Sequence, residues 1–320
     1  MIVVTGGFGL IGSNIIKQLN ANGYTDIIVV DNLENGKKVF NLNSCKIVDY
    51  LDKDNFLSQL TTSRFDNVTA VFHMGACSAT TEWNGRYVMN NNYEYTKRLI
   101  DWSIDRNIRL ICASSASVYG LGQKGFFVNE NCENPINMYA YSKLLQDNYL
   151  RHLGLPRNIS SVRFFNVFGP GEHHKGSMAS VIYHFSRQVN ANGVCQLFGD
   201  FDGYKAGEQK RDFIHVSDCV DVCLWLQKYS VGGIFNVGTS CANSFERVTD
   251  IMALWYGAKG LPFKREIIPF PAHLKGSYQS YTCADLSGLK QAGYPCQFMP
   301  IKDSIFQYLD FLDSTYTNAQ

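Results

Sequence analysis

Short apolar runs and helical patterns alternate through the first half of the chain. Residues 1–5 and 27–30 are apolar and β-branched, and between them apolar residues recur at helical spacing over residues 11–19. The second run ends at an acidic residue, and further strands are predicted at residues 68–73 and 110–113. This order of strand, helix and strand predicts an α/β fold with a parallel sheet.

A glycine-rich loop follows the first predicted strand directly. Gly6, Gly9 and Gly12 lie between that strand and the first helix. Glycines at such positions permit a tight turn, close approach of the backbone to a pyrophosphate and close packing of helix on strand. Asp31 follows the loop by about twenty residues, where an acid usually holds a ribose hydroxyl. Together these elements predict a bound nicotinamide dinucleotide.

The residues leave the choice between NAD and NADP open. The carboxylate of Asp31 would repel a 2′-phosphate and therefore favours NAD. Lys37 and Lys38 follow closely and could neutralise such a phosphate if the loop folds back. The alternative is that these lysines belong to a solvated turn at Asn35-Gly36.

Tyr139 and Lys143 are candidate proton-transfer residues. They are four residues apart in an amphipathic run, which places them side by side on one face of a helix. A phenol has an unperturbed pKa of about 10, and we expect a neighbouring ammonium, helped by a bound cofactor cation, to lower it. Ser114 or Ser115 ends a predicted strand and is placed to meet Tyr139. Such a pair alone is also typical of an exposed helix surface, but the upstream glycine loop favours the chemical interpretation.

Composition narrows the class of protein. The chain has 320 residues, 45% of them apolar, and a formal net charge of +1, which allows one large α/β domain or two lobes. It has no basic run, no secretory signal pattern and no apolar run near twenty residues, so we expect neither nucleic acid nor membrane as a partner. The ten cysteines are scattered, and Cys219 and Cys223 fit core thiols of a helix. We therefore expect a cytoplasmic protein without disulfides or a metal site.

The second half of the chain alternates less regularly. We expect a Rossmann-like, doubly wound parallel sheet built from residues 1–166 and about 213–240, because residues 214–238 return to a buried helix and strand. A smaller mixed α/β lobe for substrate would comprise residues 167–212 and about 241–320. The site would lie in the cleft between the two. In the first half, three asparagines at residues 90–92 are expected just before a helix that contains Leu99.

With these motifs in order, the chain resembles the extended short-chain dehydrogenase/reductase superfamily. The resemblance rests on the glycine loop, Asp31, Ser115 and the Tyr139-x-x-x-Lys143 pair at family-like spacing. It implies that Ser115 and Tyr139 hydrogen-bond the reacting oxygen, that Lys143 holds the nicotinamide ribose, and that a hydride moves to or from nicotinamide.

A narrower resemblance runs nearly from end to end. The chain is similar to the ADP-L-glycero-D-manno-heptose 6-epimerases at residues 31–33, 36–38, 75–78, 80–83, 91–93, 163–167, 169–170, 174–180, 210–213 and 274–276. This resemblance implies epimerisation at C6″ of ADP-D-glycero-β-D-manno-heptose through a transient ketone, for the heptose of a lipopolysaccharide core. It also implies NADP, tightly bound with one per subunit, and a homo-oligomer, a pentamer in that family.

Such an epimerase needs two groups that carry protons, because the hydride returns to the opposite face of the sugar carbon. Tyr139 would serve one orientation of the sugar and Lys175 the other, as the family's second proton acceptor. The alternative for Lys175 is a solvent-exposed loop lysine beside Gly176. His173 and His174 precede it, but no carboxylate or cysteine spacing supports a metal there.

The resemblance also assigns binding residues. Those implied for the dinucleotide are Gly6, Gly9, Leu10, Ile11, Gly12, Asp31, Asn32, Lys38, Lys53, Met74, Gly75, Ala76, Cys77, Ser78, Asn91, Lys143, Val167 and Lys175. Those implied for the substrate are Asn166, Ser177, His184, Phe198, Gly199, Arg211 and Tyr278. We expect Ser177 and His184 on a helix after Lys175. Arg211 has a fork suited to a diphosphate, unless it forms an ion pair with Asp212.

Some positions depart from the family pattern. Met74 stands where a glutamate is expected, Glu34 replaces a residue that is sometimes basic, and the loop at residues 199–209 is longer than usual. Two other functions stay open. A UDP-hexose 4-epimerase would need a single tyrosine, and a non-catalytic dinucleotide-binding protein would need no proton-transfer group. A 4,6-dehydratase is disfavoured because Ala116 and Ser117 occupy the places of its acid pair.

Overall fold

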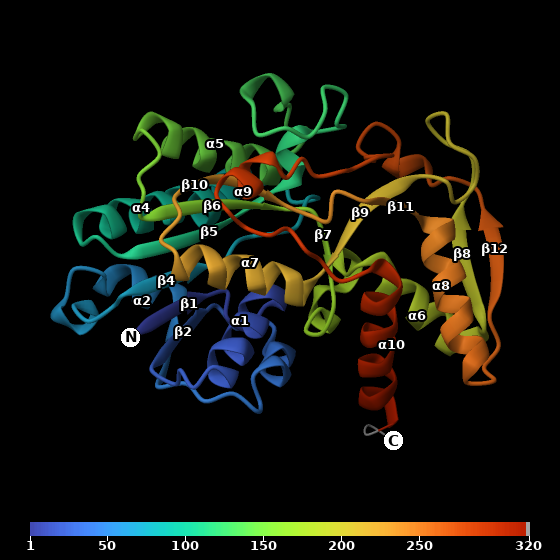
Figure 1. Cartoon of the computed structure of the whole chain (residues 1–320), viewed down its shortest axis with the longest axis horizontal. Coiled ribbons are helices and arrows are strands. Elements are labelled where there is room, and N and C mark those ends of the chain that lie inside the picture. The colour runs from blue at the N-terminus through green and yellow to red at the C-terminus, as the bar shows by residue number, and fades with distance from the viewer. Residues whose placement is uncertain (318–320) are drawn as a thin grey trace.

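Within residues 1–317, which the computed structural model describes, seven parallel strands form a large sheet (Figure 1). Its order is β10-β6-β5-β4-β1-β2-β3, so the direction of strand addition reverses between β1 and β4. The strands are β1 (Ile2–Thr5), β2 (Ile27–Asp31), β3 (Asp49–Asp52), β4 (Ala70–His73), β5 (Arg109–Ser115), β6 (Ile159–Phe164) and β10 (Gly233–Val237). The predicted Rossmann-like fold, doubly wound around this reversal, is confirmed.

Helices cover both faces of the large sheet, which is why the inner strands β1, β2 and β4 are buried and mostly apolar. One face carries α1 (Leu10–Ala21) and α7 (Val216–Lys228) in a shared core. The other carries α2 (Lys53–Gln59), α4 (Tyr95–Asp105) and α5 (Met138–His152). Cys219 and Cys223 are fully buried in α7, as the prediction of core thiols requires.

The three asparagines precede α4, which contains Leu99, as expected, but the sequence did not indicate that they are themselves helical. They lie inside a helical segment that runs from α3 (Gly85–Val88) through a π-helical turn (Met89–Glu94) into α4, and Asn84 caps its start. Asn92 is buried there, accepts a hydrogen bond from Cys77 N at 2.8 Å and donates to Cys77 O at 3.0 Å. Its amide also donates to Ser142 Oγ on α5, at 3.0 Å. This distant partner explains why a polar residue that resembles a cap lies mid-helix.

The smaller part of the fold contains mixed β structure. In the described chain, β7 (Asn166–Phe168), β9 (Lys210–His215) and β11 (Ala242–Ser244) form one sheet, and β8 (Val194–Phe198) pairs with β12 (Lys264–Ile268). Helices α6 (Val181–Asn192), α8 (Phe245–Ala258) and α10 (Ile301–Thr317) pack on these strands around a separate apolar core. The predicted mixed α/β lobe is therefore present. Short 3₁₀ helices occur at Gly36–Asn41, Ser63–Phe65, Ala116–Tyr119, Glu130–Cys132, His173–Met178 and Ala272–Leu274.

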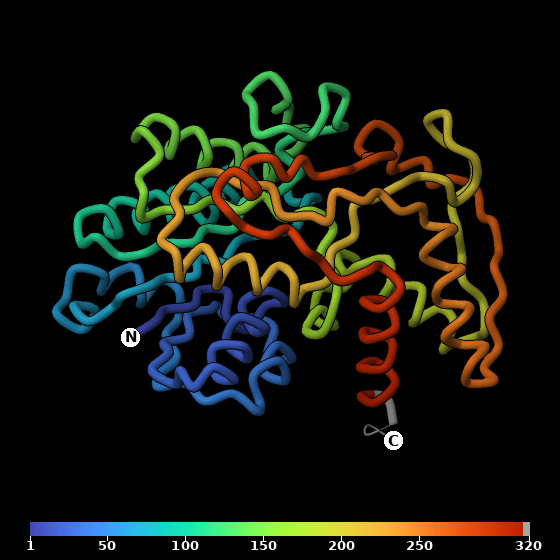
Figure 2. Tube along the Cα trace, in the orientation of Figure 1, coloured from blue at the N-terminus to red at the C-terminus, as the bar shows by residue number. Residues whose placement is uncertain are grey.

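The chain returns to the large sheet before its last helix. β10 pairs with β6 at the sheet edge, as expected from the sequence. Residues 284–289 then pack into the same core as β10 and α7, and α9 (Ser287–Gln291) lies against β10. Figure 2 shows this orange-red stretch crossing back toward the large sheet before it reaches α10. The predicted second lobe included this stretch, and the limits of the domains stay a prediction.

Asp212 links β9 through hydrogen bonds to the loop after β10 and to the segment before α9. It is fully buried on β9, and burial raises the pKa of its carboxyl. Oδ1 accepts hydrogen bonds from Thr239 N at 2.7 Å and Thr239 Oγ at 2.6 Å, in the loop after β10. Oδ2 accepts from Ser240 N at 3.0 Å and from Ala284 N at 2.8 Å. The carboxylate thus binds backbone groups of the returning chain, and the alternative of an ion pair with Arg211 is wrong.

Among residues 1–317, no helix combines the length and apolarity that a bilayer-spanning segment needs.

We predict that Asp212→Asn destabilises the protein by about 1.5–3 kcal/mol, measured as the free energy of unfolding in denaturant. The amide would place its NH₂ group against backbone N–H donors and leave them unpaired. Asp105→Asn, at an exposed site on α4, is the control and should change stability by less than about 0.5 kcal/mol. Equal stabilities of the two variants would contradict the linking role.

Candidate active site

A cavity of about 510 Å³ lies at the carboxyl ends of β1, β4 and β5, where the strand order reverses. In open α/β sheets this edge is the usual place for ligands. Every residue predicted to contact the dinucleotide lines the cavity, from Gly6 in the glycine loop to Lys175 in the turn at residues 173–178. Ser115 and Tyr139 line it too. The structure thus brings these residues together, while their individual roles stay predictions.

The glycine loop lies where backbone segments meet too closely for side chains. Gly6 has a φ of +62°, and a Cβ added there would lie 2.6 Å from Gly75 Cα, in the segment after β4. A Cβ on Gly12, in α1, would lie 2.3 Å from Gly6 O. This packing brings the start of α1, with its unpaired N–H groups, to the wall of the cavity. The cavity therefore fits a dinucleotide whose pyrophosphate lies at the start of α1.

Asp31 and Lys38 form an ion pair at one end of the cavity. Asp31 is buried, and its Oδ2 accepts a hydrogen bond from Phe8 N in the glycine loop at 3.1 Å. Its Oδ1 accepts from Lys38 Nζ at 2.8 Å. The solvated-turn interpretation holds for Lys37, which is exposed, but is wrong for Lys38. Because its charge is paired, Asp31 is a weaker argument against a 2′-phosphate than the sequence indicates.

The start of α5 positions the proton-transfer residues. Asn137 caps the helix, with its side chain accepting a hydrogen bond from Ala140 N at 2.8 Å, so Tyr139 lies in the first turn. Tyr139 hydrogen-bonds Ser115 at the end of β5. One turn further, Lys143 is 1% exposed and its Nζ donates to Ala113 O at 2.6 Å. The predicted trio therefore shares one corner of the cavity.

The electrostatics of this corner differ from the expectation. Burial raises the pKa of Tyr139, and only the hydrogen bond with Ser115 acts in the opposite direction. Burial also lowers the pKa of Lys143 to about 8, opposed by Cys112 and Asp147. The expected lowering of the phenol pKa by Lys143 is thus wrong for the protein alone. The physical reason is that burial of the phenol outweighs the hydrogen bond with Ser115.

Lys175 is half-buried against the cavity, so the alternative of a solvent-exposed loop lysine is wrong. Burial lowers the pKa of its ammonium, opposed by Glu172. Glu172 is itself fully buried and holds the turn in place, because its carboxylate accepts hydrogen bonds from Gly169 N, Ser180 N and Ser180 Oγ. Gly176 has a φ of +55°, which reverses the chain directly after the lysine.

The Lys175 turn also touches the loop after β2. His173 Nε2 lies 3.2 Å from Lys37 O, and Asn35 Nδ2 donates to His174 O at 3.5 Å. Sequence reasoning weighed His174 as a metal ligand, and the structure instead places it in the wall of the cavity. Within the described chain its buried Nδ1 has no hydrogen-bond partner. Burial, and after it the positive charge of nearby Lys38, lowers the pKa of His174 to about 4. Its place beside Lys175 in the chain was the signal for this contact. The described residues contain no cluster of three or more His, Cys, Asp or Glu side chains arranged to hold a metal.

The residues predicted for the substrate lie outside this cavity. Arg211 is 7% exposed and its guanidinium lies over the ring of Tyr278, 4.7 Å from its centroid. Phe198 packs edge-on against Tyr278, next to Gly199 at the end of β8. Sequence reasoning missed two members of this aromatic cluster, Phe201 and Phe270, whose rings stack 3.8 Å apart. These two residues lie in loops that are distant in the chain, and the sequence of neither loop indicates that the two rings meet.

The other predicted substrate residues are dispersed. Asn166 begins β7 and accepts a hydrogen bond from Thr282 Oγ at 2.9 Å. Ser177 lies in the 3₁₀ turn with Lys175, while His184 lies on α6, so the expectation that both share a helix is wrong. Ala179, which ends the 3₁₀ turn, and Ser180, which caps α6, separate the two helical segments.

Comparisons with known proteins agree with this architecture. The sequence profile of the NAD dependent epimerase/dehydratase family matches residues 2–238. A protein of Alkalilimnicola ehrlichii named ADP-L-glycero-D-manno-heptose-6-epimerase is 51% identical over 314 residues, 97% of each chain. The solved ADP-L-glycero-D-manno-heptose-6-epimerase of Helicobacter pylori is 26% identical with a TM-score of 0.80, covering 98% of this chain and 96% of that one. A UDP-glucose 4-epimerase of Thermotoga maritima is 25% identical with a TM-score of 0.77, covering 98% and 99%.

We predict that Gly12→Ala lowers the dinucleotide content of the purified protein at least about tenfold. The added Cβ would collide with Gly6 O and push α1 away from the glycine loop. The measurement is the amount of dinucleotide released from denatured protein, by chromatography. Gly257→Ala, in α8 with open space around it, is the matched control and should keep its dinucleotide. Undiminished dinucleotide in Gly12→Ala would contradict this arrangement.

Proposed function

The chain belongs to the NAD dependent epimerase/dehydratase family, and we propose that it interconverts two epimers of ADP-heptose. The reaction would turn ADP-D-glycero-β-D-manno-heptose into ADP-L-glycero-β-D-manno-heptose through a transient ketone at C6″. The observation that carries the proposal is that Tyr139 and Lys175, from separate segments, line the same cavity. The similarity to a heptose epimerase over 97% of both chains supports the choice of sugar.

The chain's own residues divide into binding and proton-transfer groups. A nicotinamide dinucleotide, the cofactor of this family, accepts and returns a hydride when it is bound. The glycine loop and the start of α1 would hold its pyrophosphate, and Lys143 its nicotinamide ribose. These contacts would leave Tyr139 and Ser115 facing the sugar carbon that reacts.

Proton transfer would use two groups in turn. As C6″ loses its hydride, Tyr139 Oη accepts the proton of the C6″ hydroxyl, and Ser115 Oγ hydrogen-bonds the same oxygen. The ketone then turns its other face, and Lys175 Nζ gives a proton to the oxygen as the hydride returns. Burial lowers the pKa of Lys175, which brings this exchange closer to neutral pH. A 4-epimerase, in which one tyrosine suffices, would have no use for a half-buried lysine at this wall.

We also propose NADP as the preferred dinucleotide. The Lys38 ammonium pairs with Asp31 at 2.8 Å, which offsets the carboxylate charge that would repel a 2′-phosphate and leaves the ammonium able to donate to that phosphate. His174, beside it, offers an unpartnered ring nitrogen within the described structure. In keeping with this function, we propose a cytoplasmic homo-oligomer, pentameric as in the family, that keeps one dinucleotide per subunit and supplies heptose for a lipopolysaccharide core.

We predict that Tyr139→Phe and Lys175→Met each lower turnover of ADP-D-glycero-β-D-manno-heptose about 10²–10⁴-fold. Each removes one proton-transfer group and retains most of the side chain's volume. The measurement is chromatographic resolution of the C6″ epimers after incubation with purified protein. Normal epimerisation by Lys175→Met would refute the two-group mechanism. Turnover of a UDP-hexose alone, independent of Lys175, would move the function to the 4-epimerases.

We predict that Lys38→Ala weakens NADP binding about 10–100-fold and leaves NAD binding equal or stronger. The variant exposes the Asp31 carboxylate, which repels a 2′-phosphate but accepts a hydrogen bond from a ribose hydroxyl. Titration calorimetry on protein stripped of dinucleotide measures both affinities. The exposed neighbour Lys37→Ala is the matched control and should change neither. An equal loss for both dinucleotides would argue against a 2′-phosphate site.

A further inference from the structure

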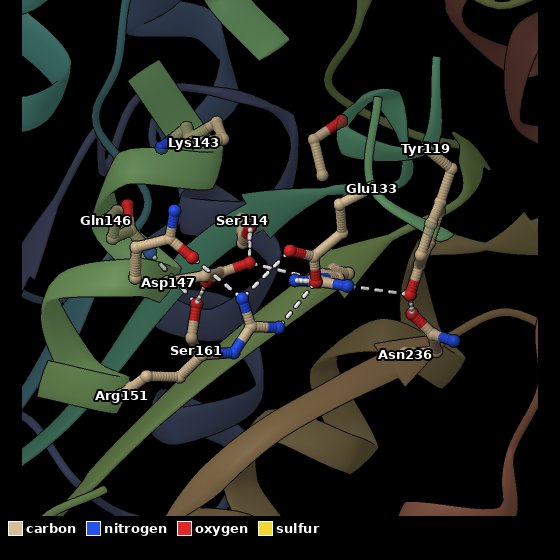
Figure 3. Close-up of polar contacts among 12 residues, drawn as sticks. Ser114, Tyr119, Glu133, Lys143, Gln146, Asp147, Arg151, Ser161 and Asn236 are labelled. Carbon is tan, nitrogen blue, oxygen red and sulfur yellow. Dashed lines mark hydrogen bonds and ion pairs between the residues drawn. The ribbon is translucent and has the colours of Figure 1, made fainter. Parts of the chain in front are cut away.

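One face of α5 carries a third polar residue besides the two in the candidate mechanism. Tyr139, Lys143 and Asp147 follow each other at intervals of four residues, which places them in a row along the helix. Each touches one of the last three residues of β5, residues 113–115. Tyr139 bonds the last of them, Lys143 Nζ donates to the carbonyl of the first, and Asp147 Oδ2 accepts from the hydroxyl of Ser114 at 3.0 Å. Figure 3 shows Lys143 and Asp147 one turn apart, with Ser114 at Asp147.

Asp147 is the deepest residue of this row. Both it and Arg163, on β6, have fully buried side chains, and Arg163 Nε donates to Asp147 Oδ2 at 2.8 Å. The hydroxyl of Ser161, on the same strand, donates to Asp147 Oδ1. Asp147 therefore connects α5 with both β5 and β6, directly behind the corner of the cavity that holds Tyr139 and Lys143.

The charge of Asp147 belongs to a largely buried cluster of Glu133, Asp147, Arg151 and Arg163. Figure 3 shows Glu133, Asp147 and Arg151 gathered at this place. Arg163 pairs with both carboxylates, and Glu133 is also paired with Arg151. The two arginines and two acids balance, so the cluster has no net charge. Removing either acid leaves one uncompensated positive charge, but at different places: beside Lys143 for Asp147, and at the far end for Glu133.

We propose that Asp147 is a positioning residue of the candidate active site, which fixes the end of β5 through Ser114 and supplies the negative charge that faces Lys143. The proposal rests on the proposed function in so far as Tyr139, Ser115 and Lys143 act in it. Asp147 has no place in that mechanism, since it does not line the cavity. Its action is exerted through the residues that do.

The surroundings of Lys143 show why this charge matters. Three titratable groups in the described structure act on its ammonium: His73 from β4, Cys112 from β5 and Asp147 from its own helix. Burial lowers the pKa of His73 to about 3 and raises that of Cys112 to about 12, so both are neutral at working pH. Asp147 therefore remains as the charged one. It opposes the burial that lowers the pKa of Lys143 to about 8.

The test compares Asp147→Asn with Glu133→Gln, which removes the same charge from the far end of the cluster. The full chain is labelled with ¹³C-lysine, the Lys143 signal is assigned with Lys143→Arg, and its titration is followed by NMR without substrate. In Asp147→Asn we expect the pKa of Lys143 to fall by about one unit or more, because an opposing charge is lost. The alkaline limb of kcat should also move to lower pH, since Lys143 is protonated only below its pKa. In Glu133→Gln neither should move.

Ser114→Ala tests the positioning half and guards against a variant that fails to fold. It removes the hydrogen bond to β5 and keeps every charge of the cluster. We expect kcat to fall about tenfold, KM to stay within about twofold, and the Lys143 titration to be unchanged. An unchanged kcat would overturn positioning through Ser114.

Three other results would overturn the electrostatic half. Asp147→Asn could lower the unfolding midpoint and leave the Lys143 titration in place, which is the behaviour of a merely structural residue. Glu133→Gln could shift the titration as far as Asp147→Asn does. The titration could also shift without any movement of the kcat limb. Because the titration needs no substrate, wild-type protein that fails to epimerise ADP-heptose would refute the proposed function and leave this measurement intact.

Discussion

The site depends on one steric constraint, the contact between backbone segments that follow neighbouring strands. The turns after β1 and β4 meet at Gly6 and Gly75 so closely that Gly6 has no room for a Cβ. The helices that follow them cover opposite faces of the sheet, α1 on one and α4 on the other. The chain therefore diverges above the point of contact, and the cavity is the space that this divergence leaves. Both the start of α1 and the strand-end serine face the cavity for this reason.

Several buried acids of the fold bind backbone N–H groups. Asp31 accepts from the glycine loop, Glu172 from both ends of the Lys175 turn, and Asp212 from two segments near β10. A carboxylate can accept several hydrogen bonds, so one such residue can hold two chain segments that are distant in sequence. Each of these carboxylates therefore links a segment of the candidate site to the large sheet or to a neighbouring segment.

The sequence predicts what local pattern controls. The strands near residues 1–5, 27–30, 68–73, 110–113 and 234–237, α1, the glycine loop and the row of Tyr139 and Lys143 follow from periodicity and spacing, and each is present. The features that the sequence missed share a cause, since they depend on partners far along the chain. Asn92 lies within a helical segment, where Cys77 and Ser142 bind its amide, and the pKa of Tyr139 is raised because the fold buries its phenol. The contact of Phe201 with Phe270 likewise needs two loops whose approach only the tertiary fold defines.

The two hydrogen bonds between the Lys175 turn and the loop after β2 bear on how the dinucleotide would be used during turnover. They join the turn that carries Lys175 to the loop that carries Lys38, and both of these lysines line the cavity. If the protein retains one dinucleotide per subunit, as proposed, it does not exchange it between turnovers. Every hydride taken from the sugar must then be given back to the same molecule. A ketone that escaped would leave the dinucleotide reduced and the subunit inactive. Holding the sugar at the outer part of the site would therefore protect the enzyme as well as select the substrate.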